Sequence, residues 1–291
     1  MAGLDHWNTV LVVVPIVGIV VATLFYLLRL ISRRLAQQRL DVGDLFMGLG
    51  LLFCYAVSLC TIIAAFSGKG QDVWSLGERS STGSRRILLF WLTQTFWPVS
   101  QVFVKLSIIM LLRQLVGRVP RWPALVAVLI VFSISWGITA FFGNIFQCSP
   151  PEVLWREPYI RGSCMPGQMT FYMVIGSLSL FEDVVLLLLP ISIVWRLRMG
   201  VKQKLQVTGL FCLGGLVCVF SLLRVIAFHN YLSKTAESSG SKEALWTVLE
   251  LDVAIVCSSL VLMRPLLARP CFAWIHCARN CEYHLDMVSN C

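Results

Sequence analysis

Charged residues are scarce in this sequence, and their scarcity excludes an ordinary soluble domain. They make up 13% of the 291 residues, while hydrophobic residues make up 57%; in soluble domains roughly 25% of residues are charged. The mean hydropathy is correspondingly high, at +0.78. Lipid is therefore the expected surrounding. At about 20 residues per crossing, the chain has room for seven membrane-spanning helices and short loops, but for no sizeable soluble domain.

The basic residues do not form a nucleic-acid-binding face, although the formal net charge is +9. Nucleic-acid-binding proteins cluster their basic residues on one polar face, whereas here these residues punctuate apolar runs. We expect no nucleic-acid partner. The orientation of the chain in a membrane explains the charge better.

The sequence also lacks the motifs of soluble enzymes. It contains no nucleotide-binding glycine loop, HExxH or GxSxG motif in a suitable strand-to-helix context. The glycines at 48–50 and 214–215 instead indicate close contacts between helices. We expect no cofactor.

Seven apolar runs are long enough to cross about 30 Å of hydrocarbon. Each run is continuously apolar and lacks the alternation of a membrane β-barrel strand, so each is predicted to be a helix. The predicted fold is an all-α, polytopic membrane bundle of seven transmembrane helices at 1–270, followed by a short tail at 271–291. The runs are Asn8 to Leu28, Leu45 to Phe66, Ile87 to Leu112, Ala124 to Phe146, Met169 to Trp195, Val207 to Phe228 and Ala244 to Met263.

The basic residues divide unevenly between the two sets of connecting segments. The segments after the first, third, fifth and seventh runs contain 14 Lys and Arg residues, and the other three contain 8. Basic loops face the cytosol, so this asymmetry predicts an N-terminus outside and a C-terminus in the cytosol. No Lys or Arg precedes the first run, whereas Asp5 does. A cleaved signal peptide would have a basic start and a shorter apolar core.

Cysteine placement agrees with this orientation. Cys148 and Cys164 are the only cysteines in a segment assigned to the outside, so we predict a disulfide between them. The tail lacks a CxxC pair, which disfavours a metal site. Juxtamembrane cysteines are candidates for palmitoylation; here they are Cys271, Cys277 and Cys281.

Six charged residues lie inside the predicted helices, where each costs several kcal/mol unless it is paired, neutral or facing water. Counted at about 1.5 Å per residue, Arg224 matches Glu250 and Asp252 in depth, and Lys105 is within reach of Asp183. Glu250 and Asp252 differ by about 200° around their helix, so only one of them faces a given partner. The six form either ion pairs that lock helix packing or a polar cavity for a ligand or proton chemistry. They are Lys105, Glu182, Asp183, Arg224, Glu250 and Asp252.

The last predicted helix argues against light sensing. Retinal proteins form a Schiff base with a lysine near the middle of their seventh helix. The run from Ala244 to Met263 contains no lysine. We therefore do not expect bound retinal.

Several motifs, in their order and spacing, resemble the fungal rhodopsin-like integral membrane family, which includes receptor-like proteins and the satratoxin-cluster type of membrane protein. The resemblance extends from about Leu28 to Pro270. Two positions depart from the family pattern: Gly43 precedes Asp44 where a paired aspartate is usual, and Gln71 replaces a histidine. The motifs are RLISRRL, VKLSIIMLLR, FQCSPPEVLWREPYIRGSC, DVVLLLLPISIVWRLRM, LGGLVCVFSLLR and LWTVLELDVAIVCSSLVLMRPLL.

The resemblance implies a multi-pass protein of the plasma membrane or an endomembrane. It also implies a receptor-like role or an accessory role in secondary-metabolite biosynthesis. A lipophilic small molecule is the expected ligand. The first alternative is a membrane-embedded cyclase or isomerase that uses a carboxylic acid, Asp183 or Glu250, as proton donor. Transport is the second alternative, although the seven runs show no obvious repeat.

Overall fold

The computed structural model describes residues 2–35, 37, 40–67, 81–116, 122–156, 163–194, 201–232 and 239–262. The tail at 271–291 and its candidate palmitoylation cysteines lie outside these residues, as does Gln71. The domain boundary at 270 therefore stays a prediction.

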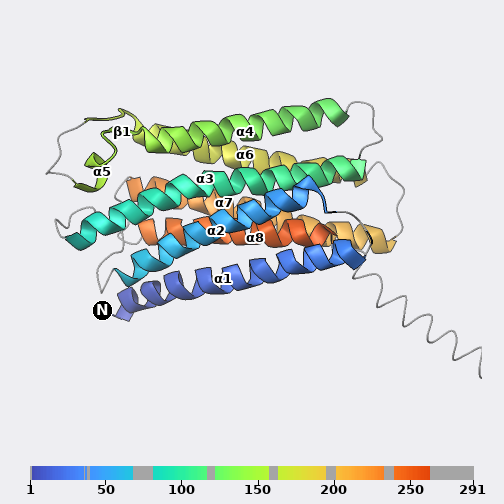
Figure 1. Ribbon diagram of the computed structural model, residues 1–291, viewed down its shortest axis with the longest axis horizontal. Coiled ribbons are helices and arrows are strands. Elements are labelled where there is room, and N and C mark those ends of the chain that lie inside the picture. Colours follow the sequence, from blue (N-terminus) through green and yellow to red (C-terminus); the bar gives the residue numbers. More distant parts are fainter. Residues whose placement is uncertain are drawn as a thin grey trace, which may run out of the picture.

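The described part of the chain is almost entirely helical. Seven of its helices have 24 to 36 residues, and each contains most of one predicted apolar run. They lie side by side along the long axis of the molecule (Figure 1). The long helices are α1 (Ala2–Leu35), α2 (Val42–Phe66), α3 (Ser81–Val116), α4 (Trp122–Ile145), α6 (Gln168–Val194), α7 (Val201–Leu232) and α8 (Ser239–Leu262).

Five of these helices, α1, α2, α3, α4 and α6, are long and apolar enough to cross a membrane. In α7 the apolar stretch within the residues whose side chains are described is Gly214–His229, and α8 contains Glu243, Glu250 and Asp252. Helix α8 is nevertheless central, because it packs against α1, α2, α3 and α7. The all-α bundle is thus confirmed, while seven crossings and their orientation stay predictions.

The two ends of the bundle differ. The N-terminus of α1 lies at the same end as the segment between α4 and α6, which contains β1 (Cys148–Ser149), α5 (Val153–Arg156) and β2 (Ser163–Cys164) (Figure 1). We call this the disulfide end. The opposite end, where α1 stops and α2 begins, we call the Asp44 end.

A disulfide closes the segment at the disulfide end. Cys148 and Cys164 are bonded and pair directly in the β1–β2 ladder, which confirms the predicted bridge. The segment is fixed to the bundle through Trp91 of α3, whose ring lies 5.3 Å from that of Trp155 and whose Nε1 donates to the Asn144 carbonyl.

Glycine lets α2 and α3 approach closely. A Cβ at Gly50 would lie 2.8 Å from a Val104 methyl, and Ser100 of α3 donates to the Gly50 carbonyl at 2.8 Å. Close contacts also occur at Gly48 and Gly214, as predicted. The prediction was wrong for Gly215, where an added Cβ would have no neighbour within 4 Å.

Candidate functional site

Arg224 and Glu250 form a buried ion pair between α7 and α8. Arg224 Nε lies 2.8 Å from Glu250 Oε2, and the two residues are 5% and 0% exposed. The guanidinium carbon lies 3.8 Å from the centre of the Trp97 ring on α3, a cation–π contact. The structure thus brings together the Arg224 and Glu250 that sequence depth had matched.

A small cavity of about 10 Å³, enough for one water, lies beside this pair. Three buried polar atoms on its lining residues have no hydrogen-bond partner: Trp97 Nε1, Asn144 Oδ1 and Arg224 Nη2. Leaving such an atom unpaired costs about 1–3 kcal/mol. The lining residues, which we call the Arg224 cavity, are Gln94, Trp97, Asn144, Tyr172, Met173, Ile175, Gly176, Arg224, Val225 and Phe228.

Glu243 of α8 lies behind the cavity wall. Its Oε1 accepts from Gln94 Nε2 at 2.8 Å and from the Thr247 hydroxyl at 3.0 Å. Among the described residues, no cationic side chain lies within ion-pair distance of it. Glu243 was not among the predicted internal charges because it directly precedes the last predicted run, where a carboxylate is expected to be solvated.

A second buried cluster surrounds Lys105 of α3. Its Nζ lies 3.1 Å from Glu182 Oε2 and 3.0 Å from Asp183 Oδ1, both on α6. Lys105 also donates to the carbonyl and the hydroxyl of Ser179, while Ser133 of α4 donates to Glu182. One lysine therefore faces two carboxylates, not Asp183 alone.

Asp252 stands apart from Arg224, as the helix geometry required. Its Oδ1 accepts from the Cys54 thiol of α2 at 3.3 Å, and its Oδ2 has no partner. The carboxyl fills a notch in α1 at Gly18, where an added Cβ would overlap Asp252 Oδ2. Within the described ranges, no cation lies within ion-pair distance of Asp252.

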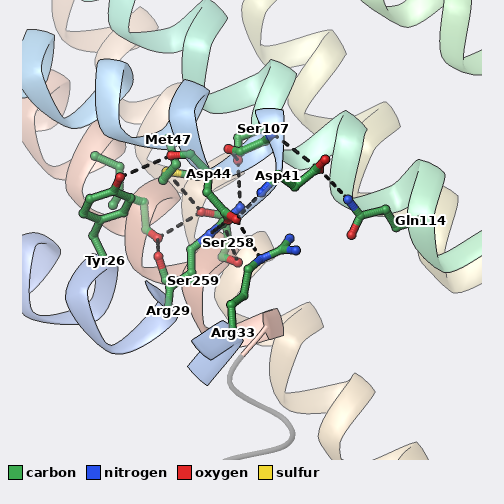
Figure 2. A network of polar contacts seen from close by, with 12 residues as sticks. Tyr26, Arg29, Arg33, Asp41, Asp44, Met47, Ser107, Gln114, Ser258 and Ser259 are labelled. Carbon is green, nitrogen blue, oxygen red and sulfur yellow. Dashed lines mark hydrogen bonds and ion pairs between the residues drawn. The ribbon is translucent and has the colours of Figure 1, made fainter. Parts of the chain in front are cut away.

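A third polar cluster ties four helices together at the Asp44 end. Arg29 and Arg33 of α1 point toward Asp44 of α2, each with Nε 2.9 Å from a carboxylate oxygen (Figure 2). Arg29 also donates to the Ser107 hydroxyl of α3 and the Ser258 carbonyl of α8. Arg29, at 0% exposure, is the largest of the fully buried side chains described.

From the sequence, these two arginines were predicted to belong to the connecting segment after the first run, and their pairing with Asp44 was not predicted. Arg29 and Arg33 are four residues apart, so they share one helix face, and this spacing was the available signal. Because both are paired inside the bundle, the excess of basic residues free to face the cytosol is smaller than the count suggested. Asp41, by contrast, caps the start of α2 and accepts from Gln114 (Figure 2).

The chain is similar to a known protein family. Residues 28–269 match the family model described as the fungal rhodopsin domain. Among solved structures, none matches the chain.

Three characterised relatives are similar to the chain. The polyenoic acids biosynthesis gene cluster protein Ba17b of Metarhizium anisopliae is 27% identical over 276 residues, covering 88% of this chain and 71% of that protein. A SAT4 family membrane protein of Emericella nidulans is 31% identical over 127 residues, covering 43% of this chain and 33% of the relative. Receptor GIN3 of Arthrobotrys oligospora is 28% identical over 137 residues, covering 46% and 32%. The match thus spans about a third of the last two relatives.

Proposed function

Because the chain belongs to the fungal rhodopsin domain family and is a multi-pass integral membrane protein, we propose that it binds a small lipophilic molecule through a polar group held in the Arg224 cavity, without retinal. Its role is receptor-like or accessory to secondary-metabolite biosynthesis. All seven long helices cross the membrane, with the disulfide end outside and the tail in the cytosol.

The observation that carries this proposal is the set of unpaired polar atoms in the Arg224 cavity. Trp97, Asn144 and Arg224 are each at most 5% exposed, yet each presents a polar atom without a partner. They come from α3, α4 and α7, and α6 supplies further lining, so four helices form the cavity. In small-molecule sites a few precisely placed polar groups fix the orientation of the ligand.

The names of the relatives support both roles. Ba17b, which aligns with most of this chain, is named for a biosynthesis gene cluster. GIN3, which aligns with less than half of it, is named a receptor. A metabolite-binding membrane protein is compatible with either name.

The composition of α8 supports the absence of retinal. From Glu243 to Leu262 this helix contains no lysine, and Lys242 stands in its first turn at the disulfide end. Helix α8 therefore offers no lysine amine with which retinal could form a Schiff base in the middle of the bundle.

An enzymatic function is the second candidate, and the unpaired oxygens of two buried acids favour it. Asp183 Oδ2 and Glu250 Oε1 have no hydrogen-bond partner, although each carboxyl also contacts a cation. If these acids donate protons to a substrate, Asp183→Asn or Glu250→Gln abolishes product formation in a reconstituted pathway while membrane abundance is unchanged. Loss of the folded protein in both variants would instead indicate a packing role.

Metabolite retention tests the binding site. The protein, reconstituted in lipid nanodiscs, is incubated with a lipid extract of fungal cells. It is then washed and analysed by mass spectrometry. Wild type should retain a metabolite that Gly176→Ala loses, because a Cβ at Gly176 would lie 3.1 Å from Val225 and 3.7 Å from Arg224 Nη2. Gly215→Ala, whose Cβ meets nothing within 4 Å, is the matched control. Equal retention by all three proteins, or none by wild type, would refute the site.

Cysteine labelling tests the orientation. After reduction, a membrane-impermeant maleimide added to sealed vesicles whose cytosolic face points outward should leave Cys148 and Cys164 unlabelled until the vesicles are permeabilised. A Cys148→Ser/Cys164→Ser variant controls for other cysteines. Labelling without permeabilisation would place the disulfide end on the cytosolic side.

A further inference from the structure

The polar atoms of the Arg224 cavity restrict which functional group can enter it. Arg224 Nη2 and Trp97 Nε1 are unpaired donors, and Asn144 Oδ1 is an unpaired acceptor. A hydroxyl group both accepts and donates, so it can pair with either kind of atom. A carbonyl oxygen satisfies the donors alone.

Among the described residues that line the cavity, Arg224 is the only cation, and it is already paired. The Arg224 guanidinium faces Glu250 at 2.8 Å, and Glu243 lies nearby with hydrogen bonds from Gln94 and Thr247. A ligand carboxylate would add a negative charge to a lipid-shielded interior without a spare cation. An ammonium group would confront the two unpaired donors. Either charge is expensive at this depth.

The cavity lining combines polar atoms with apolar side chains. The polar atoms come from α3, α4 and α7, while Met173 and Ile175 of α6 and Val225 and Phe228 of α7 supply apolar lining. The cavity volume of about 10 Å³ admits one oxygen-sized group. A bulky polar head group is therefore excluded, and the hydrocarbon of a ligand lies outside the cavity.

We propose that the Arg224 cavity takes the hydroxyl or carbonyl oxygen of an uncharged lipophilic molecule, and that it rejects carboxylates and amines. This inference rests on the proposed function, since it specifies the chemistry of the molecule bound at the same site.

Photolabelling with head-group-matched probes tests the inference. Four alkyl probes of equal chain length carry the same diazirine and end in an alcohol, a methyl ketone, a carboxylate or an ammonium group. Each is added at neutral pH to the full-length protein in nanodiscs, and labelled peptides are mapped. The alcohol and ketone should label the peptides containing Met173 and Phe228 about tenfold more than the charged probes do, a difference equivalent to one decade in affinity.

Two variants sharpen the test. Trp97→Phe removes the Nε1 donor and keeps an aromatic ring beneath Arg224, so the preference for uncharged probes should fall several-fold. Gly176→Ala should reduce labelling by the alcohol and ketone, and Gly215→Ala should not. An unchanged preference in Trp97→Phe would overturn the assignment of that donor.

The outcomes separate this inference from the proposed function. Equal labelling by all four probes, or a preference for a charged one, would overturn the inference while leaving the cavity as a ligand site. Labelling of the cavity peptides no stronger than that of the exposed α1 segment around Val20 would overturn both.

Discussion

The indole rings of Trp97 and Trp136 meet edge to face, with centroids 5.6 Å apart and an interplanar angle of 86°. Each ring also faces a buried cation: Arg224 lies over Trp97 at 3.8 Å, and Lys105 over Trp136 at 5.2 Å. The two tryptophans therefore connect the Arg224 cavity to the Lys105 cluster deeper in the bundle. Packed contacts therefore run from Arg224 through the two rings to Lys105.

Substitutions of Trp136 test the energetic part of this connection. Trp136→Phe keeps a ring facing Lys105 but loses the hydrogen bond from Nε1 to the Ile175 carbonyl. Trp136→Leu also loses the ring. We expect Leu to lower the free energy of unfolding by about 1–2 kcal/mol more than Phe does, the magnitude of a desolvated cation–π contact. Steric trapping in bicelles measures the difference.

Trp246 supplies the control for Trp136. It stacks on Phe220, and in the described part of the chain no cation lies over its ring. Its Phe and Leu variants should differ by less than those of Trp136. An equal difference at both positions would show that Lys105 gains nothing from the Trp136 ring.

The number of charges around Lys105 predicts that substitutions of Glu182 and Asp183 have strongly non-additive effects on the free energy of unfolding. Because one lysine faces Glu182 and Asp183, either Glu182→Gln or Asp183→Asn still leaves it one carboxylate partner. Each single variant should change the free energy of unfolding by less than about 1 kcal/mol. The double variant leaves a buried lysine uncompensated and should cost about 3–5 kcal/mol. A double-variant cost equal to the sum of the singles would contradict this account.

Asp44 should be far more important to stability than its neighbour Asp41. Asp44→Asn leaves Arg29 and Arg33 without their carboxylate, at an expected cost of about 3–5 kcal/mol. Asp41→Asn preserves a side-chain oxygen at the cap of α2, and asparagine caps helices about as well as aspartate. Thermal unfolding in nanodiscs compares the two. Similar midpoints for both variants would refute a stabilising role of the Arg29–Asp44 pair.

The sequence revealed charged residues in the middle of apolar runs but not those near helix ends. Arg224, Glu250 and Lys105 were conspicuous because lipid makes an unpaired charge there expensive. Arg29 and Glu243 lie close to the ends of apolar runs, where a charge is ordinarily solvated, so their burial depends on tertiary packing. Neutral polar residues such as Asn144 carry no comparable sequence signal. The helices themselves were predictable because an apolar run in lipid has few other ways to satisfy its backbone.

The contact between Gly18 and Asp252 predicts a suppressor pair. Gly18→Ala places a methyl group where Asp252 Oδ2 lies, and overpacking of this kind costs about 1–3 kcal/mol. Asp252→Ala removes the carboxyl, so the double variant should regain most of the stability lost in Gly18→Ala. Gly215→Ala again serves as control, and it should be neutral or slightly stabilising because alanine favours helix. Thermal midpoints of the four variants decide the matter. If Asp252→Ala fails to rescue Gly18→Ala, the close approach of α1 to α8 at this depth is set by other side chains, and the Asp252 carboxyl does not occupy the Gly18 notch.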